Sequence, residues 1–188
     1  MIDLTPATTA TAALVASLCD EELSLATPCD DLDVAGVVAH LDLAGQGFTA
    51  IARRTTADAP AGPFGSGRGP SWRDDLAVVL ATLAEAWGDP AAWEGSTDTG
   101  VDLPNATWGR AALTEVVVHG WDVARATGRP LDIPEPTLRA TLDHVTVFVP
   151  AAPVPELWGE PTTLPDSAPL IDRVAAATGR GPGAHPSG

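Results

Sequence analysis

Apolar residues recur every three or four positions along most of this chain, which is the spacing of one buried helical face. The clearest stripe lies in residues 34–54, where Asp33 stands at the position of an N-cap. Proline and glycine interrupt the pattern, most heavily in residues 59–70 and 150–169. The same spacing predicts further helices over residues 8–25, 72–87, 107–127, 134–148 and 170–178. The sequence therefore predicts an all-α protein.

The order of these helices favours an up-and-down four-helix bundle with a proline-rich C-terminal extension. We expect residues 1–150 to form the bundle. Residues 151–188 should form the extension, with one short helix and a mobile tail, packed on the same domain. Ser71 and Asp74 resemble a capping box at the start of the third long helix. Gly128 stands where a glycine would end the fourth.

Composition narrows the class of protein. The chain has 188 residues, of which 45% are hydrophobic, and this is enough for one sizeable core. Its formal net charge of −15 argues against binding to nucleic acid or to an anionic membrane surface. We find no uninterrupted apolar run of about 18 residues and no signal peptide, so we expect a cytoplasmic protein without a membrane segment. In that compartment Cys19 and Cys29 should be reduced, and their separation of ten positions is not the spacing of a metal knuckle.

The segment around Glu115 and His119 carries the clearest chemistry. These two residues are four positions apart in a predicted helix, so their side chains project from the same face. A carboxylate and an imidazole placed in this way can coordinate one divalent metal ion. The alternative is that Glu115 lies on the solvent face and pairs with Arg110 or Arg125.

A third ligand could come from another helix. His40 lies among apolar residues in the middle of the predicted helix 34–54, where a polar side chain needs a partner. It is either a core histidine hydrogen-bonded to a neighbouring helix or a metal ligand. Helix bundles build metal centres from inward side chains of facing helices, so His40, Glu115 and His119 together favour a site. Asp122 follows on nearly the same stripe and is either a residue that orients a ligand histidine or a surface aspartate paired with Arg125.

The chain resembles the mycothiol-dependent maleylpyruvate isomerase N-terminal domain family, within the DinB-like superfamily. Thr27-Pro28-Cys29, followed by Val34 and His40, is similar to the first motif of that family. The stretch from Glu115 to Gly128, which reads EVVVHGWDVARATG, is similar to its second motif. Two short segments near the C-terminus resemble the signature of small actinobacterial members: Pro169-Leu170-Ile171-Asp172-Arg173 and Gly179-Arg180.

This resemblance implies a DinB-like bundle that holds a divalent metal through His40, Glu115 and His119. It also implies an actinobacterial cytoplasm and mycothiol as a co-substrate. The chain departs from the family at Leu32, where a tryptophan is usual. The isomerases also use an arginine between the first histidine and the glutamate. Arg53, Arg54, Arg68 and Arg73 of this chain lie in that interval, but none of them stands in a matching motif.

Two imidazoles and one carboxylate suit zinc, nickel or iron, and zinc is the ion that we expect first. Three protein ligands leave a coordination position open, which is typical of catalytic sites. We therefore expect a metal-dependent enzyme of the thiol transferase or isomerase kind, acting on a small-molecule substrate. The alternative is a bundle that binds metal or ligand without turnover, or a relative recruited to a biosynthetic pathway with metal–water chemistry. A homodimer through exposed helix faces is compatible with the sequence.

Overall fold

A computed structural model describes residues 1–29, 32–56, 71–152 and 158–181, and within these ranges the regular structure is helical, with two isolated β-bridges and no strand. The prediction of an all-α protein is confirmed. The α-helices are α1 (Thr5–Ala16), α2 (Val34–Arg53), α3 (Trp72–Trp87), α4 (Asn105–Thr127), α5 (Glu135–Phe148) and α6 (Leu170–Ala177). Short 3₁₀ turns are η1 (Asp20–Ser24), η3 (Pro90–Trp93) and η4 (Val149–Ala151).

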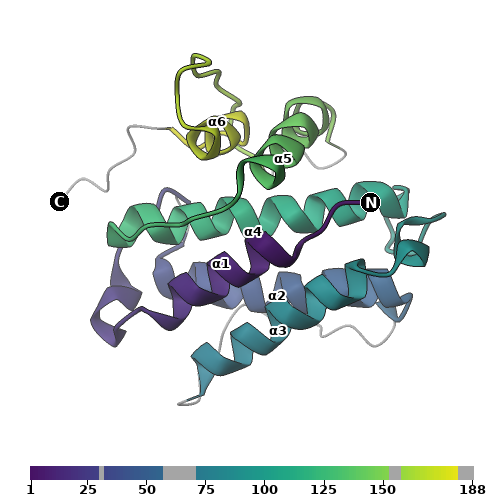
Figure 1. The fold of residues 1–188 in the computed structure, drawn as a ribbon, viewed down its shortest axis with the longest axis horizontal. Helices are drawn as coiled ribbons and strands as arrows, with labels where there is room; N and C mark the ends of the chain where they lie inside the picture. The colour runs from purple at the N-terminus through teal and green to yellow at the C-terminus, as the bar shows by residue number, and fades with distance from the viewer. Residues whose placement is uncertain (30–31, 57–70, 153–157, 182–188) are drawn as a thin grey trace.

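Helices α1 to α4 form the predicted bundle, in which α1 and α2 each contact both α3 and α4 (Figure 1). Helices α5 and α6 pack against each other and against α4, outside the bundle (Figure 1). Helix α4 therefore contacts the other bundle helices on one side and the α5–α6 pair on the other. Part of the expected proline-rich extension, residues 153–157, and the expected mobile tail, residues 182–188, lie outside the described residues.

The core is made by the apolar stripes that the periodicity predicts. Leu41 of α2, Leu80 and Trp87 of α3, and Leu113 of α4 are each at most 1% exposed. Burying a leucine-sized side chain stabilises a fold by about 1.5–3 kcal/mol, so packing of these faces, more than helix propensity, holds the bundle together. Ala44 of α2 is only half-buried.

The ends of α2 follow from local chemistry. Asp33 caps the helix as predicted, because its Oδ1 accepts a hydrogen bond from the backbone N–H of Gly36 at 2.7 Å. At the other end Arg54 adopts the left-handed conformation, with φ 59°, and closes the last turn. Gly128 ends α4 with φ 66°, as expected for a glycine at this position.

Two local predictions were wrong. The first helix ends at Ala16 rather than near Leu25, because the Ser17 hydroxyl bonds back to the Leu14 carbonyl at 2.7 Å and competes with the helical pattern. Leu25 is consequently 39% exposed. The capping box at Ser71 does not form, because the Ser71 hydroxyl donates to the carboxylate of Asp75 at 2.9 Å instead.

Helices α1 and α4 approach closely at Gly120. A Cβ atom at this position would lie 2.6 Å from Oγ1 of Thr11, which is too close for any real side chain. The Thr11 hydroxyl also donates to the carbonyl of Val116 at 3.3 Å. Glycine is required here because the Thr11 side chain of α1 packs directly on the α4 backbone, and this contact fixes the turn of α4 that carries His119.

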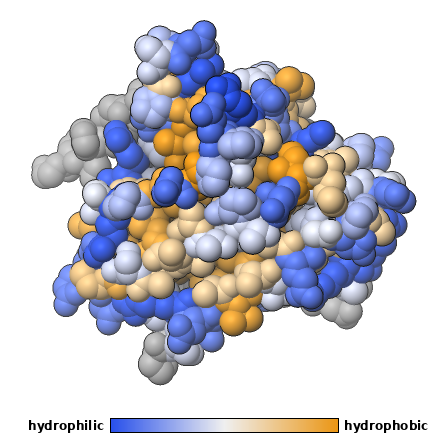
Figure 2. Space-filling view, in the orientation of Figure 1, coloured by the Kyte–Doolittle hydropathy of each residue, from blue (hydrophilic) through white to orange (hydrophobic). Residues whose placement is uncertain are grey.

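Helix α2, Val34–Arg53, is long and apolar enough to cross a membrane by length and composition, alone among the helices of the described ranges. However, 44% of its most apolar window is buried against other elements, and the core helix of a soluble protein passes the same test. In the orientation of Figure 2, exposed apolar residues form patches separated by hydrophilic residues. Large apolar side chains that are exposed lie at scattered positions: Met1, Leu25, Val78 and Val147.

Candidate metal site between helices α2 and α4

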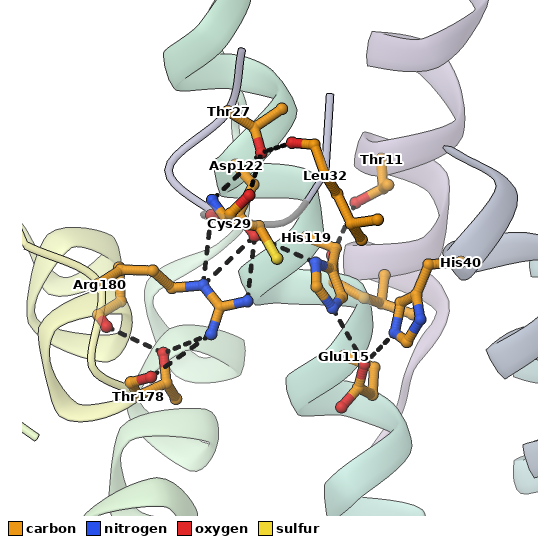
Figure 3. Close-up of polar contacts among 12 residues, drawn as sticks. Thr11, Thr27, Cys29, Leu32, His40, Glu115, His119, Asp122, Thr178 and Arg180 are labelled. Atoms are coloured by element: carbon orange, nitrogen blue, oxygen red, sulfur yellow. Dashed lines mark hydrogen bonds and ion pairs between the residues drawn. The ribbon is translucent and has the colours of Figure 1, made fainter. Parts of the chain in front are cut away.

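Three residues that the sequence singles out converge where α2 crosses α4. Nε2 of His40 lies 2.8 Å from Oε2 of Glu115, and Nε2 of His119 lies 3.2 Å from the same oxygen (Figure 3). One nitrogen from each histidine and one glutamate oxygen lie within 4.8 Å of one another. Helix α4 supplies Glu115 and His119 from adjacent turns, as the i, i+4 spacing predicts, and α2 supplies His40 from the facing helix.

The surroundings keep Glu115 ionised. Burial by itself raises the pKa of Glu115, but hydrogen bonds from His119 and His40 outweigh burial and hold that pKa well below its usual range. Burial lowers the pKa of His119, and its hydrogen bonds to Asp122 and Glu115 outweigh this effect and raise it. Glu115 therefore pairs with His40 and His119, and the alternative pairing with Arg110 or Arg125 does not occur.

Asp122 lies directly behind His119. Its carboxylate is fully buried, and Oδ2 lies 3.0 Å from Nδ1 of His119 (Figure 3). The same carboxylate accepts hydrogen bonds from Nη2 and Nε of Arg180, at 3.1 and 3.2 Å. The expected alternative, a surface aspartate paired with Arg125, does not occur. A hydrogen bond from Nδ1–H to a carboxylate orients an imidazole and leaves Nε2 to bind a metal.

Arg180 was not predicted as a site residue, although Gly179-Arg180 belongs to the C-terminal segment that resembles the family. Its side chain is 11% exposed and crosses from the end of α6 to Asp122. Gly179 permits this turn because it has φ 85°, and a side chain there would collide with the backbone of Gly159. A buried aspartate requires a cation, and this requirement is the signal that could have pointed to an arginine.

The three converging residues fit a divalent ion by the chemistry of their donor atoms. Two imidazole nitrogens and one ionised carboxylate oxygen face one point, and the orientation of His119 is fixed from behind by Asp122. The side chains of His40 and Glu115 are 23% and 20% exposed, whereas that of His119 is 8% exposed. The arrangement is therefore accessible on the side of His40 and Glu115, as an exchangeable coordination position requires.

A second group of potential ligands overlaps the first. Cys29 has its Sγ within 4.8 Å of a nitrogen of His119 and an oxygen of Asp122. The guanidinium of Arg180 already neutralises Asp122, and a second cation would be repelled there. Cys29 is held in a turn by Thr27, whose Oγ1 accepts from the Cys29 backbone N–H at 3.1 Å and donates to the carbonyl of Leu32 at 2.6 Å (Figure 3). The three residues of the first group remain the better site.

The described arginines that lie between His40 and Glu115 in the sequence contact other parts of the molecule. Arg53 lies 3.9 Å from Glu85 of α3, Arg54 donates to backbone carbonyls of the segment 91–94, and Arg73 donates to the Leu18 carbonyl and to Asp20. Arg110 is close enough to His144 of α5 to lower its pKa. Arg68 lies outside the described residues, as does His185.

Comparison with known proteins identifies one family. A family model described as the mycothiol maleylpyruvate isomerase N-terminal domain matches residues 4–124, which is more than half of the chain. The match spans α1 to α3 and most of α4, and it includes His40, Glu115, His119 and Asp122 but not Arg180. No curated protein and no solved structure matches the chain.

Proposed function

This chain belongs to the mycothiol maleylpyruvate isomerase N-terminal domain family, and from that premise we propose a metal-dependent enzyme that activates a small thiol. Mycothiol is the proposed co-substrate, and the reaction class is transfer of the thiol to a small molecule or thiol-assisted isomerisation. A cytoplasmic location is part of the same proposal. The acidic net charge of −15 supports a small-molecule substrate over nucleic acid.

One observation carries this proposal: His40, Glu115 and His119 direct two imidazole nitrogens and one carboxylate oxygen toward one another across two helices. These residues would hold the divalent ion, with zinc expected first and nickel or iron as alternatives. When bound, such an ion supplies Lewis acidity that lowers the pKa of a thiol or a water molecule toward neutrality.

The protein's own residues have separable roles. Glu115 brings the negative charge that a cation needs, and the two histidines supply nitrogen donors. Asp122 orients His119 through the hydrogen bond at Nδ1, and Arg180 keeps Asp122 neutralised inside the protein. The partial exposure of His40 and Glu115 supports arrival of small molecules from that side.

The first experiment measures metal content. The protein is dialysed against metal-free buffer, reloaded with Zn²⁺, and analysed for bound zinc by atomic emission. We expect one ion per chain in the wild type and in His144→Ala, which removes a histidine that is not part of the site. His119→Ala should lose the stoichiometric ion. Full occupancy in His119→Ala would refute the assignment of the three ligands.

The second experiment tests the thiol. Titration calorimetry of the zinc-loaded protein with mycothiol should show binding that disappears in His119→Ala and persists in His144→Ala. A protein that holds zinc and does not bind mycothiol would refute the thiol reaction. Metal–water chemistry or metal binding without turnover would then be the better explanation of the same three ligands.

A further inference from the structure

An apolar groove runs along α2 and α4 beside the candidate metal site. It has a volume of about 330 Å³, which is at the lower end of the range of ligand pockets. Its lining residues come from α2, from α4 and from the segments that follow α2 and precede α4: Ala44, Gly47, Phe48, Ile51, Thr56, Thr99 and Trp108. None of these described lining residues carries a charge.

The lining residues of α2 and α4 stand on the same pair of facing helices as the metal ligands. On α2, Ala44 lies one turn and Phe48 about two turns beyond His40, and on α4, Trp108 lies two turns before Glu115. Two contacts across the helices confirm the register, because His40 meets Glu115 at 2.8 Å and the rings of Phe48 and Trp108 lie 6.2 Å apart. These levels are eight positions apart on α2 and seven on α4, which corresponds to about 10–12 Å at 1.5 Å per residue.

The polar atoms at the far end of the groove are already engaged. The hydroxyl of Thr56 donates to the carbonyl of Asp98 at 3.0 Å, and the hydroxyl of Thr99 donates to the carbonyl of Val101 at 3.0 Å. Arg54, the cation nearest in sequence, donates instead to the carbonyls of Ala91 and Glu94. A carboxylate in this groove would therefore lose its hydration without gaining a cation or a free hydroxyl donor from these residues.

We infer that this groove binds an uncharged, apolar part of the substrate, namely an aromatic ring or a branched alkyl group. This inference rests on the proposed function, because it assigns the substrate class of the same site. An occupant packed against Phe48 and Trp108 extends along the groove toward His40, where its reactive end meets the activated thiol. The volume accommodates roughly a dozen non-hydrogen atoms, at about 30 Å³ for a water-sized group.

The test uses two probes that share a ring and differ in charge, benzyl alcohol and benzoate. Binding to the zinc-loaded wild type is measured by ligand-observed NMR. We expect benzyl alcohol to bind at least tenfold more tightly than benzoate. Equal affinity, or tighter binding of benzoate, would overturn the inference that the groove selects an uncharged group.

A variant that fills the groove locates the bound probe. Gly47 lines the groove, and a Cβ atom there would meet no atom within 4 Å, so Gly47→Leu begins a side chain in open space. It should weaken benzyl alcohol binding at least tenfold and leave the zinc content at one ion per chain. Ala81→Leu, on the exposed face of α3, makes a similar change elsewhere and should bind benzyl alcohol like the wild type. Unchanged affinity in a folded Gly47→Leu would overturn the inference.

A distance measurement connects the groove to the metal site. Paramagnetic Co²⁺ in place of Zn²⁺ should accelerate the relaxation of the benzyl alcohol protons in the wild type. No acceleration would show that the bound probe lies away from the metal site and would overturn the inference. If the protein holds no metal at all, the proposed function fails by itself. If it holds metal and benzyl alcohol does not bind, only the groove assignment fails.

Discussion

At the scale of single residues, Asp122 joins the candidate site to the end of the chain. Its carboxylate is fully buried and lies between the imidazole of His119 and the guanidinium of Arg180. A carboxylate in this position is tolerated only while a cation and hydrogen-bond donors surround it. The same two contacts therefore serve stability and the orientation of His119.

Replacing Arg180 tests this dependence. Arg180→Met leaves the Asp122 charge without its guanidinium partner and should lower the free energy of unfolding by about 3–5 kcal/mol, as measured by urea denaturation. The double variant Asp122→Asn with Arg180→Met removes the stranded charge and should recover part of this loss. Arg139→Met, which breaks an exposed pair with Glu135, should cost at most about 0.5 kcal/mol. A cost for Arg180→Met as small as that for Arg139→Met would contradict this reading of the buried pair.

The orientation of His119 is tested separately by metal affinity. Asp122→Asn replaces the carboxylate that accepts from Nδ1 with a weaker, neutral acceptor. Loss of such a partner typically reduces metal affinity 10–100-fold, and we expect a reduction in about this range for Zn²⁺ in competition with a chelating dye. Asp42→Asn, on α2 beside Gln46, is the control and should keep wild-type affinity. Unchanged affinity in Asp122→Asn would mean that His119 does not depend on this hydrogen bond.

At the scale of elements, α5 carries a histidine that responds to pH. His144 is half-buried and stacks on Phe148, with ring centroids 4.9 Å apart. Burial, assisted by the nearby charge of Arg110, lowers the pKa of His144 to about 4. An unfolded chain has the ordinary pKa of about 6.5, so it binds more protons than the folded chain between these two values.

Stability should follow from that difference. The contribution of His144 is fully present above about pH 6.5 and is lost as the pH falls toward about 4. His144→Phe keeps an aromatic ring beside Phe148 and removes the titration. The urea midpoint of the wild type should therefore fall more steeply than that of His144→Phe between pH 6.5 and 4. Parallel pH profiles for the two proteins would rule out this contribution.

Helix positions were predictable where periodicity and capping chemistry agree. Asp33 and Gly128 mark the ends of α2 and α4 because each acts within one turn of its own helix. The end of α1 was not predictable in this way. Ser17 and the following 3₁₀ turn compete with the helix through hydrogen bonds, although the apolar stripe continues past Ser17 to Leu18. The capping box did not form because the Ser71 hydroxyl donates to the Asp75 carboxylate instead of accepting from the backbone N–H of Asp74.

At the scale of the whole molecule, two helical glycines differ in their surroundings: one lies in a tight contact between elements and the other faces open space. A Cβ atom at Gly109 of α4 would lie 2.8 Å from the rings of Trp87 and Trp93, whereas one at Gly47 of α2 would meet nothing within 4 Å. The same substitution therefore has opposite expected effects at the two positions.

Thermal or urea unfolding of two variants checks this contrast. Gly109→Ala should destabilise the protein by about 1–3 kcal/mol, because packed rings must move. Gly47→Ala should stabilise it by about 0.5–1 kcal/mol, because alanine has the higher helix propensity and fits without a clash. Similar effects at both positions would contradict the described packing of α3 and η3 on α4.

The sequence by itself determined the helical class, most helix positions and the pairing of Glu115 with His119 on one face, because these depend on spacing within a single helix. It also supplied the resemblance to the family that the comparison confirms. The tertiary structure decided what faces this pair: His40 from 75 residues away, Arg180 behind Asp122 and the uncharged groove between α2 and α4. Periodicity shows that a side chain points inward, whereas the packing of two helices decides which side chains meet there.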